Sequence, residues 1–120
     1  MKYKPIPFKP TDDPADWFDS LPIDRRLKPC KDKLFSKIST KIPNIDHLAI
    51  WLGIDEGERD QIKTGNQFSV PNQVLELLTR WRKRTSRPTV EKLVKAMREA
   101  KIPDSSYQQA VLDFCSGKYS

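Results

Sequence analysis

The residue types that most often carry enzyme chemistry are scarce in this chain of 120 residues. His47 is the only histidine, and Cys30 and Cys115 are the only cysteines. They show none of the spacings that bind a metal ion, and four glycines form no phosphate-binding loop. We expect His47 to be a surface or partly covered residue and the cysteines to be free intracellular thiols, with one disulfide as the alternative. The sequence predicts no enzyme, no cofactor and no metal site.

Charged side chains are therefore the candidate functional residues. The net charge of +6 and the pI near 9.4 favour an anionic partner, which is nucleic acid, an acidic membrane surface or an acidic protein. The candidate basic face consists of Lys33, Lys37, Arg80, Lys83, Arg84 and Arg87. The candidate acidic face consists of Asp46, Asp55, Glu56, Glu58 and Asp60. This segregation predicts a basic end and an acidic end of the molecule.

The elements that carry these charges follow a proline-rich arm over residues 1–28. Six of the ten prolines lie in the first 29 residues, so the arm cannot be a continuous helix or a central strand. The segment "DPADWFDSL" predicts one short helix near residues 13–21, with Asp13 as its N-cap and Pro14 in its first turn. Because Trp17 and Phe18 are too apolar to leave in water, we expect this helix to dock on the main domain. The alternative is a linear motif that a partner recognises.

From residue 31 onward, apolar residues recur at helical spacing and predict six short amphipathic helices. The first ends at Pro43-Asn44, which also caps the second, and Gly53 is placed to end the second. Asp55 and Glu58 form a capping box that opens a third helix to about Lys63.

The fourth helix has the strongest pattern, a single apolar stripe of Val70, Val74, Leu77, Leu78 and Trp81. Thr89 caps a fifth helix, and Ser105 with Gln108 forms a capping-box pattern for a sixth, which ends near Gly117. No segment alternates with the period of a strand. Short connections between six helices predict a compact, antiparallel, all-α bundle.

Two kinds of partner compete for the basic segment "RWRKRTSR". It could be a phosphate-binding patch for nucleic acid. However, Trp81 falls on the buried stripe and is poorly placed to stack on bases. No helix places Asn, Gln and Arg together on one exposed face, as base recognition favours. A protein partner is therefore preferred, and a basic bundle that binds nucleic acid is kept as the alternative.

The segment "HLAIWLGIDEGERDQI", followed by "VLELLTRWRKRTSRPTVEKLVKAMREAKI", resembles the death domain, and the resemblance covers residues 31–116. One departure is Ile45, where the family often has Trp at the start of its second helix. The stretch "SLPIDRRLKPCKDKLFSKI" is similar to Toll/interleukin-1 pathway adaptors and kinases such as Tube and Pelle.

The resemblance implies a six-helix antiparallel Greek-key bundle over residues 29–117, with a tail at 118–120. It also implies binding to other death domains, of a receptor, adaptor, kinase or second copy, in cytoplasmic apoptotic or innate-immune signalling. Family assemblies stack helices one and four of one subunit on helices two and three of the next. The candidate basic and acidic faces fall on these two surfaces, so an open or helical oligomer is expected.

Overall fold

The computed structural model describes residues 16–117, and every regular element in that range is helical. The elements are α1 (Asp16–Asp19), α2 (Ile23–Arg26), α3 (Asp32–Ser39), α4 (Asp46–Trp51), α5 (Glu56–Gly65), α6 (Val70–Arg84), α7 (Val90–Glu99), the 3-10 helix η1 (Asp104–Ser106) and α8 (Gln108–Cys115). The six helices predicted from residue 31 onward are α3 to α8, which confirms the all-α fold over the described range.

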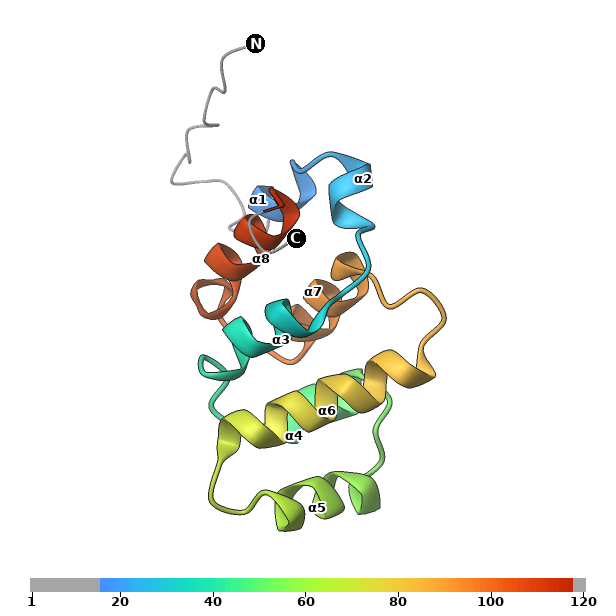
Figure 1. The fold of residues 1–120 in the computed structure, drawn as a ribbon, viewed down its shortest axis with the longest axis vertical. Coiled ribbons are helices and arrows are strands. Elements are labelled where there is room, and N and C mark those ends of the chain that lie inside the picture. Colours follow the sequence, from blue (N-terminus) through green and yellow to red (C-terminus); the bar gives the residue numbers. More distant parts are fainter. Residues whose placement is uncertain (1–15, 118–120) are drawn as a thin grey trace.

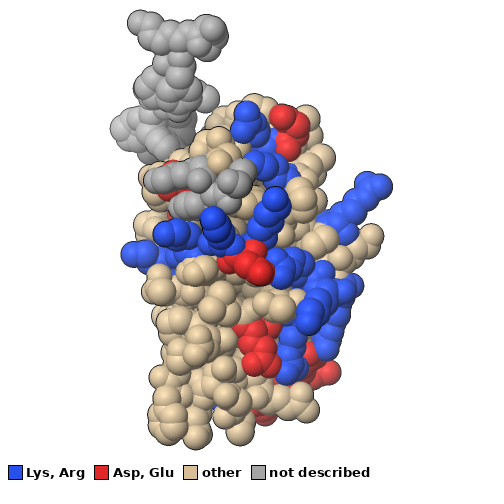
Figure 2. Space-filling model, viewed as in Figure 1, with Lys and Arg blue, Asp and Glu red and all other residues tan. Residues whose placement is uncertain are grey.

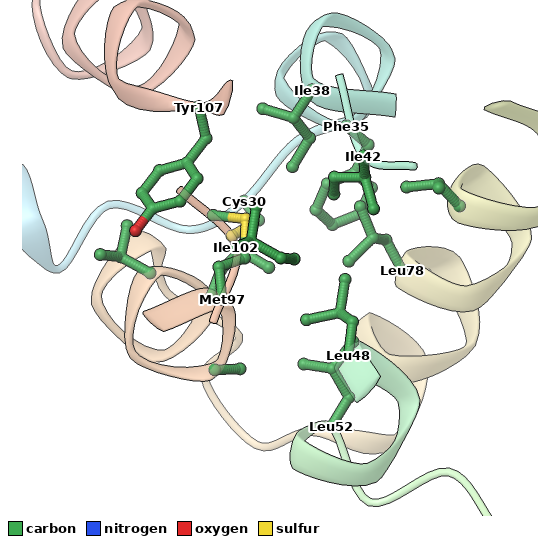
Figure 3. Packing of buried hydrophobic residues seen from close by; sticks show 14 of the residues in the cluster. Cys30, Phe35, Ile38, Ile42, Leu48, Leu52, Leu78, Met97, Ile102 and Tyr107 are labelled. Carbon is green, nitrogen blue, oxygen red and sulfur yellow. The ribbon is translucent and has the colours of Figure 1, made fainter. Parts of the chain in front are cut away.

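The long helix α6 organises the bundle. It packs against α3 on one side and α5 on the other, while α4 packs against α7 and α3 also contacts α8 (Figure 1). The interior is lined by side chains from all of these helices, and Figure 3 shows Phe35, Ile38, Leu48, Leu78 and Met97 converging on it. Each of these five side chains is buried, so one hydrophobic core holds the helices together.

Side-chain hydrogen bonds begin α5 and α7 where the sequence predicts. The carboxylate of Asp55 accepts a hydrogen bond from the Glu58 amide at 2.8 Å, and the Thr89 hydroxyl accepts one from the Lys92 amide at 3.4 Å. Gly53 ends α4 with a φ of 76°, the left-handed conformation that glycine tolerates best. The caps at Asp55 and Thr89 and the end of α4 at Gly53 are confirmed. The second half of the predicted capping box is absent, because the side-chain oxygens of Glu58 bond to Arg80 and Arg84 and not to the Asp55 amide.

The predicted capping box of Ser105 and Gln108 is wrong. Residues 104–106 form η1 instead, and α8 begins at Gln108 without a side-chain cap. The reason is Tyr107, which is 1% exposed and donates its hydroxyl to the Asp104 carboxylate at 2.7 Å. Burial of this ring fixes the preceding residues as a separate turn.

Residues 16–30, which we call the N-terminal strap, pack on α7 and α8 (Figure 1). Trp17 and Phe18 are 8% and 2% exposed, and the Trp17 indole N–H donates to the Asp104 carboxylate at 2.7 Å. The guanidinium of Arg98 lies 6.0 Å and 5.7 Å from the Trp17 and Phe18 ring centres. The expected docking of this segment is confirmed. The proposed N-cap at Asp13 and the following Pro14 lie outside the described residues.

The rest of the strap was not predicted in detail, since α2 has no apolar pattern of its own. Arg25 and Lys28 donate to the carbonyls of Cys115 and Phe114, at 2.6 and 3.3 Å. The two cations thereby bond to backbone carbonyls in the last turn of α8 that lack a partner within the helix, at the negative end of the helix dipole. The strap ends in one isolated antiparallel bridge between Pro29 and Thr89. It therefore crosses the predicted boundary between residues 28 and 29.

Candidate protein-interaction surface

The candidate basic face lies on α3, on the C-terminal half of α6 and on the loop that follows α6. Its exposed members are Lys33 and Lys37 on α3, Lys83 and Arg84 on α6, and Arg87 in the loop, whereas Arg80 on α6 is half-buried. Figure 2 shows Lys and Arg side chains gathered across the middle of this face of the molecule and down its right-hand side. The predicted cluster of positive charge therefore exists on the folded surface.

The candidate acidic residues surround the first turns of α4 and α5. Asp46 is the first residue of α4, Asp55 caps α5, and Glu56, Glu58 and Asp60 lie on α5. Asp46 accepts a hydrogen bond from the Lys63 ammonium at 2.9 Å, and this bond holds the pKa of its carboxyl below the usual value. Asp46 is thus already neutralised within its own chain.

Glu58 joins the two candidate faces directly. Its carboxylate accepts hydrogen bonds from Arg80 at 2.9 Å and from both terminal nitrogens of Arg84, the first at 2.6 Å. The Glu58 side chain is 11% exposed, and the two guanidinium groups, Arg84 foremost, lower the pKa of its carboxyl. We call Glu58, Arg80 and Arg84 the α5–α6 seam. It is a set of charge-assisted hydrogen bonds, one of them bidentate.

The seam corrects the prediction of a separate basic end and acidic end. Helices α5 and α6 are joined by a connection of only four residues, 66–69. They run back along each other, so the first turn of α5 lies beside the last turns of α6 (Figure 1). Residues assigned from the sequence to opposite faces consequently bind each other, because the hairpin brings them together.

A smaller set of charges remains available to a partner. Lys33, Lys83 and Arg87 form no ion pair with another residue of the described range 16–117. On the acidic side, Glu56 and Asp60 lie 3.7 Å from the Arg59 guanidinium, and their side chains are 82% and 64% exposed. Such exposed ion pairs contribute little to the free energy of unfolding. Glu56 and Asp60 can therefore leave Arg59 for a partner's cation at a small free-energy cost.

Sequence reasoning missed Arg82, which connects α6 to α3. Its guanidinium donates to the Asp32 carboxylate at 2.5 Å and lies 5.0 Å from the centre of the Phe35 ring. Asp32 and Arg82 are 50 residues apart, and no local pattern pairs them. Trp81, on the same helix, is 6% exposed, as the apolar stripe predicted. The centre of its ring lies 6.5 Å from the centre of the Phe35 ring. A buried Trp81 is not available to stack on bases.

Outside the N-terminal strap, three large apolar side chains in the range 31–117 also face solvent, and none of them was predicted as a site. Ile50 and Trp51 on α4 are 61% and 51% exposed, and Phe68 between α5 and α6 is 95% exposed. The sequence gives only a weak signal for their exposure: Ile50 and Trp51 lie outside the apolar stripe that contains Leu48 and Leu52. Exposed aromatic side chains are frequent anchors of protein interfaces.

The remaining groups that could carry chemistry in the described range are the two cysteines and His47. Burial raises the pKa of the Cys30 thiol to about 12 and also raises that of Cys115, and both cysteines are free. A thiol held in its neutral form is a poor nucleophile. His47 is exposed, as expected, and the described residues contain no cluster suited to a metal ion. Among these same residues, none of the helices combines the length and the apolar character that crossing a bilayer requires.

An all-helical bundle that exposes charged and aromatic side chains offers a surface that a protein partner can bind. The family model of the death domain matches residues 33–106, more than half of the chain, so the chain belongs to the death domain family. Death domains are generally non-enzymatic modules of protein–protein interaction. Comparisons with curated proteins and with solved structures found no match.

Proposed function

We propose that this chain binds other death domains, either of a partner protein or of a second copy, to assemble a cytoplasmic signalling complex of the apoptotic or innate-immune type. The observation that carries the proposal is the exposure of Lys33, Lys83 and Arg87, on α3, α6 and the loop after α6, in a death-domain bundle. None of these three forms an ion pair with another residue in the range 16–117. Receptor, adaptor and kinase death domains are the expected partners. An open or helical oligomer is the expected form of the complex.

The α5–α6 seam supports a smaller set of binding residues than the two candidate faces contain. Arg80 and Arg84 both donate to Glu58, and Arg80 also donates to Glu76, so their charges are already compensated before a partner arrives. Lys83, Arg87 and Lys33, with Lys37 beside them on α3, are the residues that can meet a partner's carboxylates. On the opposite side, the exposed carboxylates are Asp55, Glu56 and Asp60. Complementary charge of this kind steers association and fixes orientation.

The test is complex formation by the double variant Lys83→Glu/Arg87→Glu. The probes are a panel of receptor, adaptor and kinase death domains and the chain itself, and the readout is light scattering over a salt series. We expect affinity for the bound death domain to fall roughly tenfold or more, with a weaker salt dependence, while helicity is unchanged.

The control is Lys101→Glu, which reverses one charge, half of the change in the double variant, on the exposed turn after α7. It should bind as the wild type does. Unaltered binding of the double variant to a death domain that the wild type binds would exclude this face as the docking surface.

A further inference from the structure

The connection between α6 and α7, residues 85–89, carries three hydroxyl groups, those of Thr85, Ser86 and Thr89. It lies at the right of the bundle in Figure 1 and directly follows the basic last turn of α6. A hydroxyl beside cations can accept a phosphoryl group from a protein kinase when it is exposed and when other bonds do not occupy it. The three hydroxyls differ in both respects.

Two of the three hydroxyls are bound to the ends of the neighbouring helices. The Thr85 hydroxyl donates to the Trp81 carbonyl at 2.6 Å, in the last turn of α6. The Thr89 hydroxyl accepts from the Lys92 amide at 3.4 Å and caps α7. Both threonines are half-buried. Either hydroxyl would have to give up its bond to a helix end before it could react, and the loss of a cap is destabilising.

The Ser86 hydroxyl is the free one of the three. Ser86 is exposed, and its hydroxyl forms no hydrogen bond with any residue in the range 16–117. The backbone just before it is extended, with a φ of −98° and a ψ of 126° at Thr85, where α6 has ended. An exposed hydroxyl in a connection outside the helices is accessible to the active site of another enzyme.

Cations precede Ser86 at the positions that many kinases read. Lys83, three residues before it, is exposed and forms no ion pair with another residue in the range 16–117. Arg84, two residues before it, is 54% exposed, so an acidic group of another protein can reach its guanidinium and replace Glu58 there. Protein kinases select their substrates by the charge pattern around the acceptor hydroxyl. This pattern suits a kinase whose substrate groove is acidic.

We propose that Ser86 is a phosphorylation site for a protein kinase with an acidic substrate groove, and that its phosphate weakens binding at the basic face. In the reaction, the Ser86 oxygen forms a bond to the γ-phosphorus of ATP, and the bond from that phosphorus to the β–γ bridging oxygen breaks. ADP leaves, and the hydroxyl proton passes to a carboxylate of the kinase. This modification deepens the proposed function and rests on it, because it regulates the same docking surface.

A phosphate on Ser86 lies among cations that the proposed function assigns to a partner. The Lys92 ammonium donates to the Ser86 carbonyl at 2.6 Å, and Arg87 is the next residue in the chain. A phosphoserine carries a charge of about −1.5 to −2 at neutral pH and forms charge-assisted hydrogen bonds with such groups. Arg87 is then no longer free for a partner's carboxylates, and the added negative charge repels those carboxylates.

The experiment first maps phosphate on the full 120-residue chain after incubation with ATP, Mg²⁺ and the catalytic subunit of the cyclic-AMP-dependent protein kinase, which prefers such basic sites. Peptide mass spectrometry should locate phosphate on Ser86, and Ser86→Ala should lose it. Ser105 is the internal control, because it is also exposed but follows Pro103 and Asp104 in place of two cations. It should stay unmodified. An unmodified Ser86, or phosphate on Thr85 in its place, would overturn the inference.

Light scattering then compares the phosphorylated and unmodified chains with a death domain that the unmodified chain binds. Phosphorylation should weaken binding roughly tenfold or more, and Ser86→Asp should weaken it in the same direction. The matched control is Ser105→Asp, which adds the same charge on η1 and should bind as the wild type does.

Equal affinity of the phosphorylated and unmodified chains would also overturn the inference. If Ser86 stays unmodified while Lys83→Glu/Arg87→Glu loses binding, the inference fails and the proposed function stands. Absence of binding by the unmodified chain to every death domain tested would instead refute the proposed function, and the phosphate map alone then decides whether Ser86 is the acceptor.

Discussion

Truncation of Phe18 tests whether the N-terminal strap is part of the cooperative fold. Phe18 is 2% exposed and packs edge to face with Trp17, with ring centres 5.7 Å apart. Replacing a buried Phe with Ala costs about 3–5 kcal/mol through lost transfer free energy and the cavity left behind. Because small domains have about 5–15 kcal/mol of stability in total, Phe18→Ala should remove a large share of it.

Thermal and urea denaturation followed by circular dichroism measure this loss. At roughly 4 °C per kcal/mol for a domain of this size, the midpoint should fall by about 12–20 °C. The control is Ile23→Ala, which truncates an apolar side chain of the same strap that is 55% exposed, and it should change stability by less than about 1 kcal/mol. A single unfolding transition in both variants shows that the strap and bundle unfold together.

Hydrogen exchange provides a local measurement of the same effect. The Val90 amide donates to the Lys28 carbonyl and the Cys30 amide donates to the Pro88 carbonyl, both at 2.9 Å. These bonds tie the strap to the start of α7, so their amides should exchange faster in Phe18→Ala than in Ile23→Ala. A loss below about 1 kcal/mol, with unchanged exchange at both amides, would refute the view that the strap belongs to the fold.

Two further predictions concern the seam and the helix ends. Glu58→Gln should lower the free energy of unfolding at neutral pH, and the difference from wild type should vanish on acidification. The pKa of Glu58 in the folded state lies below the ordinary glutamate value of 4.5. The stabilisation is therefore complete above pH 4.5 and is lost as the pH falls through the folded pKa. Urea denaturation from pH 3 to pH 7 measures the difference, and a gap that does not narrow below pH 4.5 would exclude the ion pairs as its cause. Gly53→Ala should cost about 1–2 kcal/mol, because alanine is strained at a φ of 76° even though no atom lies within 4 Å of the added methyl group. Gly65→Ala at the end of α5 is its control, since it also has open space and no positive φ, and equal effects of the two changes in thermal denaturation would argue against backbone strain.

Local patterns account for most of the predicted fold. Apolar periodicity located α3 to α8, because a helix that buries one face must repeat apolar residues every three to four positions. Asp55 and Thr89 were identified as caps because a cap bonds an amide only three residues away.

Helix α2 was not predicted, because its residues show no such local pattern. Ile23 and Leu27 are 55% and 47% exposed, so burial produces no pattern there. Bonds from Arg25 to Cys115 and from Arg26 to Glu91 hold the segment instead. Those partners are 90 and 65 residues away, beyond the reach of local sequence reasoning.

The candidate surface shows the same division between local and tertiary information. The sequence identified which residues are charged, and their positions on α3, α5 and α6 followed from helical spacing. It did not pair Glu58 with Arg80 and Arg84, which are 22 and 26 residues away, because that pairing depends on how α5 folds back along α6. Arg82 and Asp32 were missed for the same reason.

In the proposed complex, the seam would couple partner binding to the stability of the domain. A partner that recruits Arg84 must replace the bidentate bond with Glu58, and a partner that approaches Glu58 must displace two guanidinium groups. Reversal of either charge therefore changes the fold and the interface together, and a loss of binding in Arg84→Glu does not by itself identify a contact. Lys83 and Arg87 are free of this coupling, since neither forms an ion pair with another described residue. Charge reversal at these two positions changes what a partner meets while leaving the seam intact, and that makes them the informative positions for mapping the interface.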